Sequence, residues 1–234
     1  MSIVQVQNVH RNYQQGTHIV KALQGVSIEI EKGEFTALMG PSGSGKTTLL
    51  NIIGGLDIPD QGDVSIDGQS LKALSSEELS DLRLQKLGFV FQAYNLMPVL
   101  TAFENTEFVM LLQGVSASDR KSKAMKTLQD VGLGGMEGRL PSELSGGQQQ
   151  RVAVARAIAG DPVLVLADEP TANLDSKTGT ELIALMRKLN EEQNVTFVFA
   201  THDPKVMDAA KRIVTLEDGC IISEERTDRD AHSE

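Results

Sequence analysis

The apolar positions of this chain fall into short runs that are separated by segments with helical spacing. Two β-like segments come first, and the later apolar runs lack polar alternation, as expected for parallel strands covered on both faces. We therefore predict strands at 3–9, 26–30, 35–39, 88–91, 163–167, 195–200 and 212–216. Because helical patterns lie between these strands, the chain is predicted to have an α/β core.

Capping signals and apolar stripes indicate where the helices lie. One helix is predicted over 47–54, directly after the third strand. Ser75 with Glu78 forms a capping-box signature ahead of another apolar stripe. Asp203-Pro204 is typical of an N-cap followed by proline at the first helical position. A further stripe at helical spacing consists of Leu182, Leu185, Met186 and Leu189.

The stretch from about 93 to 159 differs from the rest, because it is helix-like and carries another capping box at Thr101 and Glu104. We interpret it as a helical subdomain inserted into a core made of 1–92 and 160–222. Its four methionines are interpreted as adaptable packing rather than as a ligand site. From Ser223 onward the chain is polar and acidic, and we predict a frayed tail over 223–234.

Composition and charge narrow the range of functions. Of the 234 residues, 40% are hydrophobic and 23% are charged, which is typical of a globular protein. The net charge of −10 argues against nonspecific nucleic-acid binding, which needs a basic face. A single cysteine, Cys220, excludes an internal disulfide framework and fits a reducing compartment. We expect neither a signal peptide nor a membrane helix, since no apolar run approaches about 18 residues.

A glycine-rich motif with the pattern G-x-x-x-x-G-K-[ST] stands between a predicted strand and a predicted helix, where a phosphate-binding loop belongs. Its glycines allow backbone N–H groups to surround phosphate oxygens at a helix N-terminus. We expect Lys46 to contact the β- and γ-phosphates, Thr47 to bind Mg²⁺ and Thr48 to assist at the α-phosphate. The motif residues are Gly40, Pro41, Ser42, Gly43, Ser44, Gly45, Lys46 and Thr47.

Distinctive polar residues follow three other predicted strands. Gln92 follows one, Asp168-Glu169 the next and His202 a third. Ligands of open parallel sheets lie outside the carboxyl ends of the strands, so these groups would surround one nucleotide if the strands are neighbours. We predict that Asp168 and Gln92 bind Mg²⁺ directly or through water, that Glu169 is the general base, and that His202 contacts the γ-phosphate. Gln92 or His202 alone would not indicate a nucleotide site, and each supports one only together with the other residues of this set.

A second anion-binding pattern opens a predicted helix at 144–148. Ser145 with Gln148 forms a capping box, and Gly146 and Gly147 expose backbone N–H groups at the helix start. The five residues alone are equally typical of a flexible loop. Their continuation as Gln-Gln-Arg-Val-Ala-Val-Ala-Arg-Ala makes the pattern specific.

At this point the chain resembles the ATP-binding-cassette (ABC) ATPases, from residue 3 to about 223. The resemblance implies a P-loop NTPase (RecA-like) core with an N-terminal antiparallel β subdomain and an inserted α-helical subdomain. It also implies a head-to-tail homodimer that holds ATP and Mg²⁺ between one phosphate loop and the Ser145–Gln148 segment of the other subunit. The matching motifs, in order, are Tyr13 (expected to stack on adenine), the phosphate loop, Gln92, the Ser145 signature, Asp168-Glu169, the D-loop ending at Asp175, and His202.

Within this family the chain is most similar to the lipoprotein-releasing (LolD-like) and macrolide-exporting (MacB-like) ATPases. The likeness rests on 54–57, 87–92, 95–98 and 165–175. It implies a peripheral subunit on the cytoplasmic face of the inner membrane that drives export. Its partner would be a membrane permease whose cytoplasmic helix docks beside 92–98.

Three alternatives stay open at this stage. The first alternative is a mechanotransmission ATPase that controls a periplasmic or cell-wall process. The second is a soluble cassette ATPase of DNA repair or translation, and the third is a module that holds ATP without turnover. Against the second, the chain has neither a long coiled-coil insertion nor a second cassette. The residues alone do not reveal the transported substrate.

Overall fold

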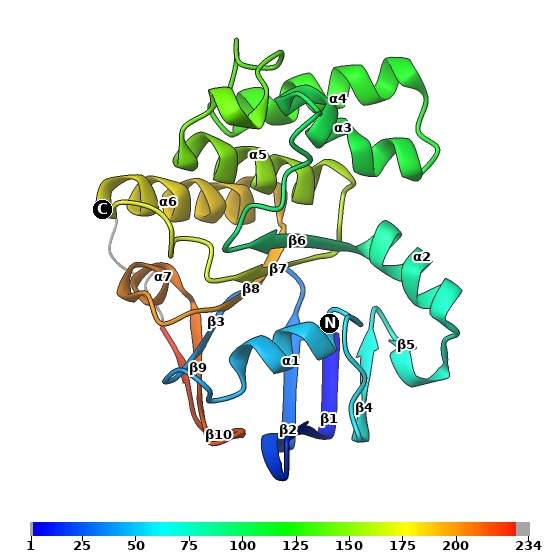
Figure 1. Cartoon of the computed structure of the whole chain (residues 1–234), viewed down its shortest axis with the longest axis vertical. Helices are drawn as coiled ribbons and strands as arrows, with labels where there is room; N and C mark the ends of the chain where they lie inside the picture. The colour runs from blue at the N-terminus through cyan, green and yellow to red at the C-terminus, as the bar shows by residue number, and fades with distance from the viewer. Residues whose placement is uncertain (1, 228–234) are drawn as a thin grey trace.

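The computed structural model describes residues 2–227, which form two β-sheets, a helix between them and a layer of helices on the far side (Figure 1). The larger sheet has six strands in the order β10-β9-β3-β8-β7-β6. Its strands are β3 (Phe35–Met39), β6 (Leu87–Phe91), β7 (Leu164–Asp168), β8 (Thr196–Ala200), β9 (Arg212–Glu217) and β10 (Cys220–Arg226). All neighbouring pairs are parallel except β9 and β10. The parallel core predicted from the unalternating apolar runs is therefore confirmed.

The central parallel strands of the larger sheet are buried on both faces, and alternate residues of each strand point to opposite faces. On β7, Leu164 and Leu166 belong to the core shared with α1 and the smaller sheet. Val165 and Ala167 belong to the core shared with the helical layer. One strand thus supplies two hydrophobic cores, which explains why its sequence shows no polar alternation.

The smaller sheet is antiparallel and has the order β2-β1-β4-β5. Its strands are β1 (Ser2–Gln15), β2 (His18–Glu31), β4 (Gln61–Ile66) and β5 (Gln69–Ser70). The first two are longer than predicted, because β1 and β2 continue as a hairpin whose outer half is exposed. The short β4 and β5 were not predicted, since Gly62, Asp63 and Gly68 interrupt their apolar pattern.

Seven α-helices and two 3₁₀ helices lie among residues 2–227. They are α1 (Lys46–Ile53), η1 (Leu71–Ala73), α2 (Ser76–Lys86), α3 (Ala102–Leu112), α4 (Ala117–Asp130), η2 (Pro141–Glu143), α5 (Gly146–Ala159), α6 (Ser176–Gln193) and α7 (Pro204–Ala209). The predicted capping boxes form at α2 and α3, where Ser75 and Thr101 accept hydrogen bonds from the backbone of Glu78 and Glu104. Asp203 caps α7 as predicted.

Helices α3, α4 and α5 occupy the region between 93 and 159 (Figure 1). They share a small hydrophobic cluster of their own, made of Met110, Ala124 and Ala159. Val152 and Ala155 of α5 pack instead in the same cluster as Val165 of β7 and Phe199 of β8. Helix α5 therefore joins the other two helices to the sheet.

The prediction of a frayed tail from Ser223 was wrong for its first residues, because the chain up to Arg226 forms the second half of β10. The second half of β10 is polar, and ion pairs instead of apolar packing stabilise it. Arg212 of β9 binds both Glu34 and Glu224 at 2.9 Å. The remainder of the predicted tail, 228–234, lies outside the described residues. No helix within 2–227 has the length and hydropathy to span a membrane.

Candidate functional site

The carboxyl ends of β3, β8, β7 and β6 lie side by side, in that order, at one edge of the larger sheet. A pocket of about 670 Å³ opens there. Of the residues predicted from the sequence, those that line it are Tyr13, Pro41, Ser42, Gly43, Gly45, Lys46, Thr47, Thr48, Gln92, Glu169 and His202. The structure therefore brings residues of these dispersed motifs together at one pocket.

The phosphate loop owes its path to glycines at positions where a side chain would collide. Gly40 has a φ of 142°, and a Cβ there would stand 2.0 Å from the carbonyl oxygen of Leu216. A Cβ at Gly45, with φ 103°, would lie 2.5 Å from the carbonyl oxygen of Ala22. Gly43, in contrast, faces open space. The loop is thus packed closely on one side and open on the side of the pocket.

Lys46 is the cation at the centre of this loop. Its side chain is only 7% exposed, and its Nζ donates to the carbonyl oxygens of Gly40 and Pro41, both at 2.8 Å. The lysine is the first residue of α1, so its ammonium group adds to the positive end of the helix dipole. A buried ammonium beside exposed backbone N–H groups favours an anion with several negative charges.

Thr47 lines the pocket, and the carboxylate of Asp168 lies next to its hydroxyl. The hydroxyl of Thr47 donates to Oδ1 of Asp168 at 3.1 Å. Burial raises the pKa of Asp168 and the charge of Glu169 adds to this, whereas Thr47 and Lys46 act in the opposite direction. A carboxylate, a hydroxyl and the nearby amide of Gln92 are hard oxygen ligands of the kind that Mg²⁺ prefers, with phosphates and water completing its shell. The donor set therefore fits a magnesium ion.

Glu169 is held in an unusual conformation beside His202. Its φ of 44° lies in the left-handed region, which is rare outside glycine and is found at functional sites. Oε1 of Glu169 lies 2.7 Å from Nδ1 of His202, and its Oε2 accepts from the hydroxyl of Thr201 at 3.0 Å. The carboxylate is thus oriented at both oxygens at the end of β7, where it lines the pocket.

Gln92 lies where the chain leaves β6, in a segment whose backbone is fixed by side chains from elsewhere. The carbonyl oxygen of Gln92 accepts from Nδ2 of Asn173 at 2.9 Å. Gln150 donates to the carbonyl oxygens of Phe91 and Pro170 at 3.3 and 2.8 Å. Gln150 thereby connects the ends of β6 and β7 to α5.

Arg156 of α5 fixes the next part of this segment. It donates to the carbonyl oxygens of Tyr94 and Asn95, which both have positive φ. Burial lowers the pKa of Arg156. None of Gln150, Arg156 and Asn173 was predicted to be a functional residue. The available signal was that Gln150 is a polar residue at helical spacing from the buried Val154 and Ala157.

The Ser145 segment does not line the phosphate pocket of its own chain. Ser145 caps α5 as predicted, accepting from the N–H of Gln148 at 3.3 Å. With Gly147 and Gln148 it lines a separate open pocket of about 300 Å³. Gly146 opens the same helix, and a Cβ there would stand 2.9 Å from the hydroxyl oxygen of Tyr94. The two predicted anion sites are thus separate within one chain.

Asp175 of the predicted D-loop is the N-cap of α6. Its carboxylate accepts from the backbone N–H groups of Lys177 and Thr178, both at 3.0 Å, and from the hydroxyl of Thr178 at 2.6 Å. These hydrogen bonds, led by that of the Thr178 hydroxyl, lower the pKa of Asp175. Thr178 also lines the pocket of the Ser145 segment, so Asp175 stabilises one wall of that pocket.

Comparison with known proteins identifies a single family. The family model described as "ABC transporter" matches residues 23–172. An uncharacterised ABC transporter ATP-binding protein of Thermotoga maritima is 49% identical over 224 residues, which cover 96% of this chain and 95% of that protein. The macrolide export ATP-binding/permease protein MacB of Mannheimia succiniciproducens is 45% identical over 224 residues, covering 96% of this chain but 35% of MacB.

A solved structure agrees with the sequence comparison. The uncharacterised ABC transporter ATP-binding protein MJ0796 of Methanocaldococcus jannaschii is 45% identical over 228 residues, covering 96% of this chain and 97% of MJ0796. Its dimeric structure in a post-hydrolysis state, bound to ADP and Pi, has a TM-score of 0.87 and covers 95% of this chain and 98% of that one. The predicted resemblance and fold class are thereby confirmed.

Proposed function

The chain belongs to the ABC transporter family of ATP-binding proteins, and from this premise we propose that it is the ATP-hydrolysing subunit of a transporter. The observation that carries the proposal is the placement of Lys46, Asp168, Glu169 and His202 around one pocket at the ends of neighbouring strands. This arrangement supplies a cation for phosphates, oxygen ligands for Mg²⁺ and a carboxylate for the attacking water.

The phosphates of ATP bind to the phosphate loop. Backbone N–H groups of 40–47 and the ammonium of Lys46 contact the β- and γ-phosphates, and Thr48 assists at the α-phosphate. Thr47, Asp168 and Gln92 hold Mg²⁺, which neutralises negative charge on the phosphate oxygens. Tyr13 stacks on the adenine.

Glu169 activates water for attack on the γ-phosphate. Thr201 and His202 fix both of its oxygens, so the carboxylate is oriented before the nucleotide arrives. The side chain of His202 is 74% exposed whereas that of Glu169 is 18% exposed. His202 therefore extends further into the open pocket and contacts the γ-phosphate itself.

Two subunits complete each site. Ser145 to Gln148 expose a helix N-terminus that lies in a separate pocket from the phosphate loop of the same chain. A head-to-tail dimer brings this segment onto the phosphates bound by the partner subunit. The dimeric form of MJ0796 supports this arrangement. ATP binding closes the dimer, and hydrolysis opens it again.

The membrane partner is a separate permease. MacB carries ATP-binding and permease functions in one protein, and this chain matches about a third of MacB. The partner's cytoplasmic helix docks in a hollow of about 400 Å³ between β6, α2, α3 and α5, lined by Phe89, Phe91, Asn95 and Leu112 among others. The chain then lies on the cytoplasmic face of the inner membrane and drives export.

Replacing Glu169 with Gln tests the proposal. The variant keeps the size of the side chain but removes the base, so it should bind MgATP, form a stable ATP-bound dimer and release almost no phosphate. Phosphate release and size-exclusion chromatography with MgATP measure the two effects. The matched control is Glu191→Gln, because Glu191 lies on α6, is absent from the lining of the pocket and has its carboxylate paired with Arg187 at 2.8 Å.

The result is decisive in both directions. Near wild-type phosphate release by the Glu169→Gln variant would show that another group acts as the base. Loss of turnover in both variants would indicate a general effect on folding. Wild-type protein that binds MgATP without any turnover would favour the module that holds ATP without hydrolysis.

A further inference from the structure

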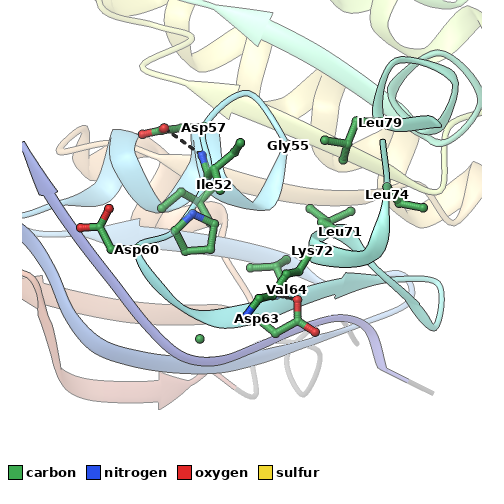
Figure 2. Close-up of a pocket in the computed structure, with 13 residues that line it drawn as sticks. Ile52, Gly55, Asp57, Asp60, Asp63, Val64, Leu71, Lys72, Leu74 and Leu79 are labelled. Atoms are coloured by element: carbon green, nitrogen blue, oxygen red, sulfur yellow. Dashed lines mark hydrogen bonds between the residues drawn. The ribbon is translucent and has the colours of Figure 1, made fainter. Parts of the chain in front are cut away.

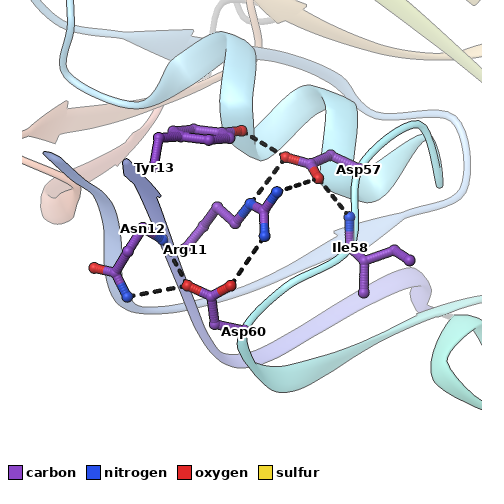
Figure 3. Close-up of polar contacts among 6 residues, drawn as sticks. All are labelled: Arg11, Asn12, Tyr13, Asp57, Ile58 and Asp60. Carbon is purple, nitrogen blue, oxygen red and sulfur yellow. Dashed lines mark hydrogen bonds and ion pairs between the residues drawn. The ribbon is translucent and has the colours of Figure 1, made fainter. Parts of the chain in front are cut away.

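A polar cluster joins Tyr13 to the loop that follows α1 (Figure 3). The hydroxyl of Tyr13 donates to Oδ2 of Asp57 at 2.5 Å. Arg11 binds the same carboxylate with two hydrogen bonds, from Nε to Oδ2 at 3.0 Å and from Nη2 to Oδ1 at 2.7 Å. Nη1 of Arg11 also donates to Asp60 at 2.9 Å. One arginine therefore binds two carboxylates, and one of these binds the tyrosine.

Arg11 also covers one face of the Tyr13 ring. Its guanidinium carbon lies 4.8 Å from the ring centroid, which is a cation–π distance. Figure 3 shows the ring nearly edge-on, with Arg11 on one side of it and the Asp57 carboxylate at its hydroxyl. Two independent contacts thus fix the ring, one at its face and one at its edge.

Asp57 is attached to the helix that carries the phosphate loop. The backbone N–H groups of Leu56 and Asp57 donate to the carbonyl oxygen of Asn51 at 2.8 and 3.3 Å. Helix α1 has eight residues and begins at Lys46, so it spans about 12 Å from the phosphate loop to this loop. The cluster therefore connects an aromatic residue of the smaller sheet to a rigid element that starts at the phosphates.

Packing alone does not fix the loop that carries Asp57 and Asp60. A cavity of about 160 Å³ lies behind it, between α1, β4 and the η1–α2 segment. Figure 2 shows the two aspartates on one side of this cavity and the leucines of η1 and α2 on the other. Ile58, between the aspartates, is 68% exposed. Polar contacts therefore restrain the two carboxylates: Arg11 binds both, and the N–H groups of Ile58 and Asn12 donate to Asp57 and Asp60.

We propose that Arg11 and Asp57 are positioning residues for the base of the nucleotide, and that they hold the Tyr13 ring at a fixed distance and tilt relative to the phosphate loop. This inference rests on the proposed stacking of Tyr13 on adenine. Arg11 occupies one face of the ring, so the base binds to the opposite face. Bidentate pairing of the partly buried Arg11 and Asp57, whose side chains are 24% and 22% exposed, gives the ring one orientation.

The test compares two probes of the full-length chain, MgATP and magnesium tripolyphosphate, by competition against a fluorescent ATP analogue. Only ATP carries a nucleoside, so a change in the ratio of the two affinities between variants reports contacts with the base and ribose. Because base–aromatic stacking is lost, Tyr13→Ala should lower this ratio about 5- to 150-fold, the equivalent of about 1–3 kcal/mol. Arg11→Gln and Asp57→Asn should each lower it about 3- to 10-fold and leave tripolyphosphate affinity unchanged. Tyr13→Phe, which removes only the hydroxyl contact, should have a smaller effect.

The matched control is Asp63→Asn. Asp63 lies on β4 near the same cavity, but its carboxylate contacts Ser70 and the backbone of Val64 instead of the cluster. Its affinity ratio should equal that of the wild type. Thermal unfolding of each variant separates a loss of positioning from a loss of folding.

A double variant distinguishes positioning from a direct role. If Arg11 acts through the ring, then Arg11→Gln should cause no further loss when Tyr13 is already alanine. An equal loss in both backgrounds would overturn the inference. The inference would also be overturned if Arg11→Gln and Asp57→Asn had wild-type affinity ratios while Tyr13→Ala had a reduced one. In that case the stacking of Tyr13 on adenine would still be supported. An unchanged ratio for Tyr13→Ala would refute stacking itself.

Discussion

The two ends of the nucleotide pocket differ in the groups that provide their contacts. At the phosphate end, the backbone of the glycine loop and the buried Lys46 provide the contacts. At the base end, which consists of Arg11, Tyr13, Asp57 and Asp60, partly exposed side chains provide them. Backbone contacts are the same for any residue that the fold allows, whereas side-chain contacts depend on each residue present.

The difference also affects how strongly each end responds to substitution. Lys46 is only 7% exposed, so solvent screens its charge less than at the surface and a change there removes a stronger interaction with the phosphates. The base end is open to water and salt, which weaken each of its ion pairs. We therefore expect large, local effects at the phosphate end and small, cooperative effects at the base end.

The largest effect should come from Lys46→Ala. This change removes the only buried lysine among the described residues, together with its charge-assisted contacts to phosphate. Affinity for MgATP should fall at least about 100-fold, or about 3 kcal/mol, measured by isothermal titration calorimetry. Lys188→Ala, at an exposed position of α6, is the matched control. Unchanged affinity would contradict the role given to Lys46 and with it the contrast between the two ends.

A smaller effect should separate two glycines of the same loop. Gly40→Ala places a Cβ against the carbonyl of Leu216, so the variant should lose about 2 kcal/mol of unfolding free energy from collision and strain. Gly43→Ala meets no atom within 4 Å, and only its φ of 81° is unfavourable, which costs about 1 kcal/mol. Urea denaturation measures both. Equal losses would indicate that the loop relaxes around either methyl group.

The same contrast explains which parts of the site the sequence predicts. The phosphate end is one contiguous motif, and the carboxylates stand directly after apolar strands, so periodicity and spacing locate them. Sheet order then brings Gln92, Asp168 and His202 together, as expected from parallel topology. The parallel strands were predicted for the same reason, since burial on both faces leaves a visible apolar run.

The base end leaves no such pattern. Arg11 and Asp57 are 46 positions apart and meet only because β1 pairs with β4 across the end of α1. Similarly, Gln150 and Arg156 reach carbonyl groups of the Gln92 segment about 60 positions away. Long-range contacts between single polar residues depend on tertiary structure and carry no local periodicity. The half of β10 beyond Ser223 was missed because ion pairs stabilise it instead of an apolar stripe.

The smallest effect concerns Asp60 and its dependence on pH. The N–H of Asn12 donates to Asp60 at 2.7 Å and is the main cause that lowers the pKa of this carboxyl, with Arg11 contributing next. Because the pKa of Asp60 is lower in the folded than in the unfolded protein, its ionised carboxylate stabilises the fold. This stabilisation is fully present at pH values above the unfolded pKa of about 4. This stabilisation disappears as the pH falls through the lower, folded pKa. Asp60→Asn should therefore cost about 0.5 kcal/mol at pH 6, and the cost should be smaller at pH 3.

Urea denaturation followed by circular dichroism at both pH values measures this difference. The same measurement with Arg11→Gln added to the wild type and to the Asp60→Asn variant tests whether Asn12 or Arg11 lowers the pKa of Asp60 more. Since the Asn12 amide contributes more than Arg11, the difference between pH 6 and pH 3 should shrink but persist without the arginine. Its complete loss would mean that Arg11 alone stabilises the carboxylate. The base end would then depend on one ion pair, and Arg11→Gln would release Asp57 and Asp60 together.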